Sequence, residues 1–137
     1  MTPPTLALVA AGILIFTGVV HTLAELFGAR GPHPPELQTL LASMKSTRVS
    51  LPGREVSIYR LMRGSSLCMG LLFVGLGSID LALALDASPA SPIPAAVLGI
   101  NVAITGFGAF LAMRYFFVVP ITLLGLACAG FIAALWV

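Results

Sequence analysis

Long runs of apolar positions alternate with short polar stretches along the whole chain. The apolar runs cover about residues 5–28, 61–85, 94–113 and 119–136. A helix rises 1.5 Å per residue, so the roughly 30 Å hydrocarbon core of a bilayer takes about 20 residues. Each run is long enough, and the pattern therefore predicts four membrane-spanning helices.

Glycine and proline mark the ends of these predicted helices. Gly28, Gly31 and Pro32 follow the first run, and Pro94 and Pro120 suit the first turns of the third and fourth helices. No polar loop separates the third run from the fourth. Because a residue before proline is pushed toward an extended conformation, the stretch 114–119 predicts a tight turn in the membrane interface.

The connection between the first two runs carries elements of its own. After Pro34 and Pro35, apolar residues recur at helical spacing and predict a short amphipathic helix on the membrane surface, with Leu37, Leu40, Leu41 and Met44 on one face. Apolar and polar residues then alternate on either side of the pair Pro52-Gly53. This alternation is compatible with a small hairpin or with an extended return.

Composition excludes an ordinary soluble domain. Hydrophobic residues make up 58% of the 137, while Asp, Glu, Lys and Arg make up 9%, against about 25% in soluble proteins. No basic residue precedes the first run, so that run is predicted to be a retained helix rather than a secretory signal peptide. We expect an all-α integral membrane four-helix bundle, with residues 1–137 as a single transmembrane domain.

The basic residues predict the orientation of this bundle. Six of the seven fall in residues 30–63 and the seventh is Arg114. By the positive-inside rule both connections are cytoplasmic, which places both termini on the outer side. We expect membrane lipids as partners, and no nucleic acid, with lipid headgroups contacting Lys45, Arg48, Arg54, Arg60 and Arg114.

Ionisable residues inside a bilayer are costly, so each is a candidate functional residue. His21 and Glu25 lie four apart on the first helix and share one face. Arg63, or else Arg60, lies at a similar depth on the second helix and is expected to pair with Glu25. A structural clamp between the two helices is the favoured interpretation, with a proton relay or a ligand site as alternatives.

A second polar group is expected toward the outer side. Asp80 and Ser78 on the second helix lie at a depth comparable to Asn101 and Thr105 on the third. A hydrogen bond between Asn101 and Asp80 would satisfy both side chains. Polar residues that hold the helices together are the favoured interpretation, and an outward-facing polar pocket is the alternative.

The sequence contains few residues in a pattern that would form a metal, cofactor or catalytic site. His21 and Glu25 offer two ligands where zinc needs three or four, and His33 lies in the connection. Cys68 and Cys128 have no CxxC spacing and are expected to be buried small residues. We therefore predict no metal, no cofactor and no catalytic residue.

Three stretches resemble a known family when they are taken together. They are the run LPGREVSIYRLMRGSS (51–66), the run GLLFVGLGSIDL (70–81) and the run RYFFVVPI (114–121) after an apolar helix with Asn101 near its start. The combination is similar to an uncharacterised family of short bacterial four-helix integral membrane proteins. The resemblance implies a bacterial inner-membrane protein of this length and topology, and it carries no activity and no residue roles.

Three functional hypotheses follow from these patterns. The first is an accessory or structural subunit that packs in a larger membrane complex or a homo-oligomer. It is suggested by the lack of a catalytic constellation and by small-xxx-small pairs such as Gly99 with Ala103. The second is a small proton-linked carrier or permease that uses Glu25 and His21. The third, an enzyme acting on a lipid, lacks a set of nucleophile, base and orienting group.

Overall fold

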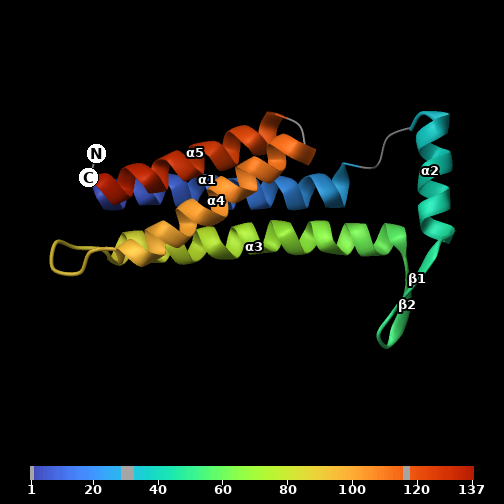
Figure 1. Cartoon of the computed structure of the whole chain (residues 1–137), viewed down its shortest axis with the longest axis horizontal. Helices are drawn as coiled ribbons and strands as arrows, with labels where there is room; N and C mark the ends of the chain where they lie inside the picture. Colours follow the sequence, from blue (N-terminus) through green and yellow to red (C-terminus); the bar gives the residue numbers. More distant parts are fainter. Residues whose placement is uncertain (1, 29–32, 116–117) are drawn as a thin grey trace.

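Four long helices form a bundle, and a shorter helix and a β-hairpin lie at one end of it (Figure 1). The structure is a computed structural model that describes residues 2–28, 33–115 and 118–137. The long helices are α1 (Pro3–Phe27), α3 (Ile58–Asp86), α4 (Ala95–Tyr115) and α5 (Val118–Trp136). Between α1 and α3 come α2 (Pro35–Ser46), β1 (Arg48–Leu51) and β2 (Arg54–Ser57).

The two ends of the bundle differ in what they carry. Figure 1 shows both termini and the α3–α4 connection at one end, which we call the termini end. The helix α2 and the hairpin lie at the other, the hairpin end, where α2 stands across the direction of the long helices.

Local sequence accounts for the helix boundaries. Pro3 opens α1, and Gly28 caps its end in a right-handed helical conformation. The predicted stop at Gly31 and Pro32 lies outside the described residues. The hydroxyl of Ser57 accepts a hydrogen bond from the backbone N–H of Arg60, so α3 begins three residues before the predicted start at 61.

Proline plays two different roles at the later helices. The carbonyl of Pro94 accepts a bond from the N–H of Val97, so this proline precedes α4 instead of lying in its first turn. Pro120 does lie in the first turn of α5, as predicted. The predicted tight turn at 114–119 includes Phe116 and Phe117, which lie outside the described residues.

A true hairpin follows α2. Strands β1 and β2 pair antiparallel, with Val49 opposite Val56 and Leu51 opposite Arg54. Pro52 and Gly53 form the turn, and Gly53 adopts φ +83°, a conformation that glycine enters without steric cost. Of the two predicted alternatives, the hairpin is confirmed.

A helix is present at the predicted place after Pro34. It is α2, and none of its residues is buried against the rest of the chain. Lys45 lies in its last turn, where a cation complements the helix dipole. Its placement on a membrane surface stays a prediction.

Helix α1 lies between α3 and α5, and glycines bring α1 and α3 close together. A Cβ on Gly18 would come within 2.5 Å of the carbonyl oxygen of Gly70. One on Gly77 would come within 2.8 Å of the carbonyl oxygen of Ala11. These distances are shorter than van der Waals contact, so only glycine permits this approach.

The hydrophobic core is formed by buried residues of all four long helices. Its members are mainly small, with Ala7, Ala10, Ala127 and Phe131 fully or almost fully buried. Buried positions on α5 are spaced three and four apart, at 124, 127, 131 and 134. This spacing puts one stripe of each helix against its neighbour.

The outer surface of the long helices is apolar. All four are long and apolar enough to cross a membrane, and large side chains such as Leu72 and Phe107 are exposed on them. Contiguous apolar surface of this kind would be unfavourable in water but is matched by lipid chains. The prediction of four helices that are long and apolar enough to span a membrane is therefore confirmed.

Candidate functional site

The first polar cluster joins α1 to α3 toward the hairpin end. His21 and Glu25 lie one turn apart on α1 and face Arg63 and Ser66 on α3. Positions 21 and 25 continue the stripe that contains Gly18, while 63 and 66 continue the one that contains Gly70. The close glycine packing therefore sets the distance between the polar side chains.

Ser66 is at the centre of this cluster. Its hydroxyl donates to Oε2 of Glu25 at 3.0 Å, and Nε2 of His21 lies 2.9 Å from the same hydroxyl oxygen. The ring nitrogen also lies 3.1 Å from the backbone carbonyl of Ser66, which can only accept. Nε2 of His21 therefore carries a proton and donates to both oxygens of Ser66.

Arg63 completes the cluster. Its Nε lies 3.5 Å from Oε1 of Glu25, and the two side chains are 38% and 28% exposed. A guanidinium nitrogen also donates to the backbone carbonyl of Glu25 at 3.3 Å. The predicted ion pair is confirmed with Arg63 rather than with Arg60.

These bond directions restrict the chemistry of the cluster. A serine becomes a nucleophile when a base accepts its proton, as the lone pair of a histidine does in hydrolases. Here the imidazole presents an N–H to Ser66, and the hydroxyl proton points to a carboxylate. The arrangement resembles a hydrogen-bonded clamp or a short proton path more than an activated nucleophile.

The second polar cluster joins α3 to α4 toward the termini end. Nδ2 of Asn101 donates to Oδ1 of Asp80 at 2.6 Å, which confirms the predicted hydrogen bond. Asp80 is 4% exposed and Asn101 1%. Oδ2 of Asp80 and Oδ1 of Asn101 have no hydrogen-bond partner among the described residues.

The other two residues expected in this cluster bond to their own helices. Thr105 is buried, and its hydroxyl donates to the carbonyl of Asn101. Ser78 is exposed and donates to the carbonyl of Val74. Ser78 therefore takes no part in the hydrogen bond between Asn101 and Asp80.

The two clusters are far apart. Ser66 and Asp80 are 14 residues apart on α3, which corresponds to about 21 Å along a helix. Thr17, buried between them on α1, donates its hydroxyl to its own helix at Ile13. Among the described residues, no side-chain hydrogen bond links one cluster to the other.

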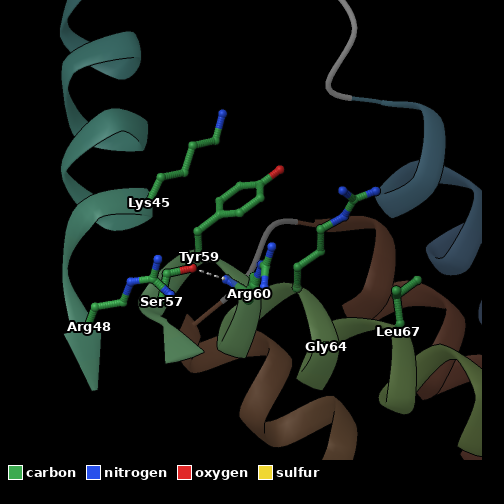
Figure 2. Close-up of a pocket in the computed structure, with 8 residues that line it drawn as sticks. Lys45, Arg48, Ser57, Tyr59, Arg60, Gly64 and Leu67 are labelled. Carbon is green, nitrogen blue, oxygen red and sulfur yellow. Dashed lines mark hydrogen bonds between the residues drawn. The ribbon is translucent and has the colours of Figure 1, made fainter. Parts of the chain in front are cut away.

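The basic residues expected at lipid headgroups separate into two groups. Lys45, Arg48 and Arg60 line one groove at the hairpin end (Figure 2). Arg63 lines the same groove. Arg54 lies in the hairpin and Arg114 in the last turn of α4, and neither lines that groove. Arg30 lies outside the described residues.

The cysteines and possible metal ligands are dispersed. The described residues hold no group of three or more His, Cys, Asp or Glu side chains that could bind a metal ion. Cys68 is exposed on α3, so the prediction that it is buried is wrong. Cys128 is partly buried, and its Sγ lies 3.7 Å from the carbonyl oxygen of Val102.

Two features of these sites were not predicted. The bridging position of Ser66 between His21 and Glu25 is one, because it depends on the rotation of two helices. The groove depends on α2 folding back toward the start of α3, where Nζ of Lys45 lies 5.2 Å from the ring centroid of Tyr59. No protein-family model, curated protein or solved structure matches the chain.

Proposed function

We propose that this protein is an accessory or structural subunit that packs in a larger membrane complex or a homo-oligomer. Its location is the inner membrane of a bacterium, with the hairpin end in the cytoplasm and both termini outside. The positive-inside rule supports this orientation, because the basic residues of α2, the hairpin and the start of α3 gather at one end.

The observation that carries the proposal is the internal pairing of the intramembrane polar groups. Glu25 bonds to Arg63 and Ser66 across α1 and α3, and Asp80 bonds to Asn101 across α3 and α4. Polar bonds of this kind hold helices together in a bilayer. Because these side chains bond to one another across neighbouring helices, they support a structural role for the protein.

The surface left over by this internal packing suits a neighbouring helix. Gly18, Gly70 and Gly77 are used between α1 and α3. Gly99 on α4 has open space where a side chain would be, and Ala103, one turn further on, is exposed. A small-xxx-small pair left open by its own chain allows a second helix to approach closely.

Native mass spectrometry of the protein extracted gently from its own membrane tests the proposal. We expect a hetero-complex or a homo-oligomer, and a lone monomer would overturn it. Gly99→Leu should reduce the assembled fraction at least fivefold. Gly12→Leu is the matched control, because Gly12 also has open space around it but lies between the bulky Leu8 and Phe16.

A second candidate function is a proton-linked carrier, and one observation favours it. The hydrogen bonds from His21 through Ser66 to Glu25 form a continuous chain of proton-carrying groups. Such chains of acidic and histidine side chains serve as proton relays in transporters. The distance of this chain from Asp80 is the reason for ranking the carrier second.

Proton flux into liposomes distinguishes the two functions. A carrier would acidify vesicles that contain the purified protein, and Glu25→Gln and His21→Ala would each slow this at least tenfold. Asp86→Asn is the matched control, since Asp86 is an exposed carboxyl at the far end of α3. A flux that neither of the two substitutions changes would exclude the carrier.

A further inference from the structure

A basic groove opens at the hairpin end, between α2, the hairpin and the first turns of α3. It has a volume of about 580 Å³. Its polar lining includes Lys45 from the end of α2, Arg48 from the start of β1 and Arg60 from α3 (Figure 2). Arg63, also from α3, completes the basic lining. None of its eight lining residues is acidic.

Most of this positive charge is available to a ligand. Arg63 pairs with Glu25, and the ammonium of Lys45 lies over the ring of Tyr59. Among the described residues, Arg48 and Arg60 have no ion-pair partner. The positive end of the dipole of α3, a helix of 29 residues, lies at the same groove. Charge complementarity therefore selects an anion.

An apolar track leads from the charges along α3. Arg60, Gly64, Leu67 and Leu71 are spaced four, three and four apart, which puts them on one face of the helix. Gly64 has open space where a Cβ would be, and Leu67 lines the groove next to it. Leu71, one turn beyond Leu67, is 69% exposed. The track thus passes from the groove onto the apolar surface of the bundle.

We propose that this groove binds one anionic phospholipid, with its phosphate between Lys45, Arg48 and Arg60 and an acyl chain over Gly64 and Leu67. The charges match the phosphate of a lipid, as basic pockets beside transmembrane helices do. The apolar track favours a lipid over a free phosphate ion, because a free ion has no apolar part that could contact the track. This site goes beyond the proposed subunit role and does not depend on any protein partner.

Native mass spectrometry with defined lipids tests the site. The full chain in mild detergent is titrated with palmitoyl-oleoyl phosphatidylglycerol and, separately, with palmitoyl-oleoyl phosphatidylcholine. We expect at least a fivefold preference for a single bound phosphatidylglycerol. Equal binding of the two lipids would overturn the proposal.

Two kinds of variant examine the two halves of the site. The double variant Lys45→Ala with Arg60→Ala should reduce phosphatidylglycerol binding at least fivefold, with Arg54→Ala as its control outside the groove. Gly64→Leu should reduce binding to a similar extent by filling the track without changing the charge. Gly12→Leu is the matched control on α1.

Inorganic phosphate separates a lipid site from an ion site. At millimolar concentration it should displace less than a fifth of the bound phosphatidylglycerol at constant ionic strength. Full displacement, together with unchanged binding to the Gly64→Leu variant, would show a site for free phosphate and overturn the proposal. Arg54→Ala acting as strongly as the double variant would show diffuse surface charge and would also overturn it.

Discussion

The hydroxyl oxygen of Ser66 lies 3.0 Å from Oε2 of Glu25, and this bond joins α3 to α1. The same hydroxyl accepts the Nε2 proton of His21. One small side chain on α3 therefore satisfies two ionisable side chains of α1. A hydrogen bond to an ionised partner is stronger than one between neutral groups.

Ser66→Ala should destabilise the bundle. The variant removes a hydrogen bond to a charged group and leaves Oε2 of Glu25 without its serine partner, a loss of about 1–3 kcal/mol. The free energy of unfolding, measured by titrating SDS into mixed micelles, reports this loss. Ser65→Ala is the control, because Ser65 is exposed on the same helix. Equal stability of the two variants would contradict a central role for Ser66.

The glycines between α1 and α3 should tolerate no larger side chain. Gly77→Leu would press its side chain against the carbonyl oxygen of Ala11, whose distance from an added Cβ is 2.8 Å. Overpacking lowers the free energy of unfolding by about 1–3 kcal/mol. We expect the upper end of this range for Gly77→Leu, because the contact is with backbone atoms, which cannot rotate away as a side chain can. Gly64→Leu on the same helix meets open space and should unfold at the same SDS concentration as the wild type. The prediction fails if both variants unfold together.

At position 80 an amide should be tolerated in place of the carboxyl group, whereas an apolar residue should not be tolerated unless Asn101 is replaced as well. Asp80→Asn keeps an acceptor for Nδ2 of Asn101, so its stability should stay within about 0.5 kcal/mol of the wild type or exceed it. Asp80→Leu leaves the buried amide of Asn101 without its acceptor and should lower the free energy of unfolding by about 1–3 kcal/mol. Adding Asn101→Leu should recover most of that loss, because no polar partner is then left unpaired.

The free energies of unfolding of these Asp80 and Asn101 variants are measured in the same way, by titrating SDS into mixed micelles. If Asp80→Asn were as destabilising as Asp80→Leu, the carboxyl of Asp80 would have a role beyond accepting one hydrogen bond. Its Oδ2, which has no hydrogen-bond partner among the described residues, is the atom that would carry such a role.

Cysteine labelling should reveal opposite sides for the two ends of the bundle. In a chain with Cys68→Ser and Cys128→Ser, a single cysteine is placed at Ser91, in the α3–α4 connection, or at Arg54, in the hairpin. An impermeant maleimide should label Ser91→Cys in intact cells and Arg54→Cys only after the membrane is opened. The reverse pattern would invert the proposed orientation.

Apolar length and local signals made much of the fold predictable. The predicted helices at 61–85 and 94–113 differ from α3 and α4 by one to three residues at each end. Membrane insertion depends on how many apolar residues follow one another, a property of the sequence alone. The hairpin was harder to predict, because four-residue strands give a short signal and Pro52-Gly53 also suits an extended return.

Some residue pairs of the candidate sites could also be predicted from their positions along the helices. Glu25 and Arg63, and likewise Asp80 and Asn101, were paired by their depth along neighbouring helices, and both pairs are present. Depth follows from the rise per residue. Depth alone does not decide which arginine pairs with Glu25, because Arg60 and Arg63 are similar in depth and differ in the direction they face around α3.

The sequence alone determined four apolar helices, the gathering of basic residues in two connections and the depth of each polar group. The tertiary structure decided the rest: Ser66 between His21 and Glu25, Ser78 outside the Asp80 cluster, and Lys45 and Arg60 around one groove. The physical reason is that these contacts depend on how each helix is rotated about its axis. That rotation is set by packing between helices, such as the close approach at Gly18 and Gly70.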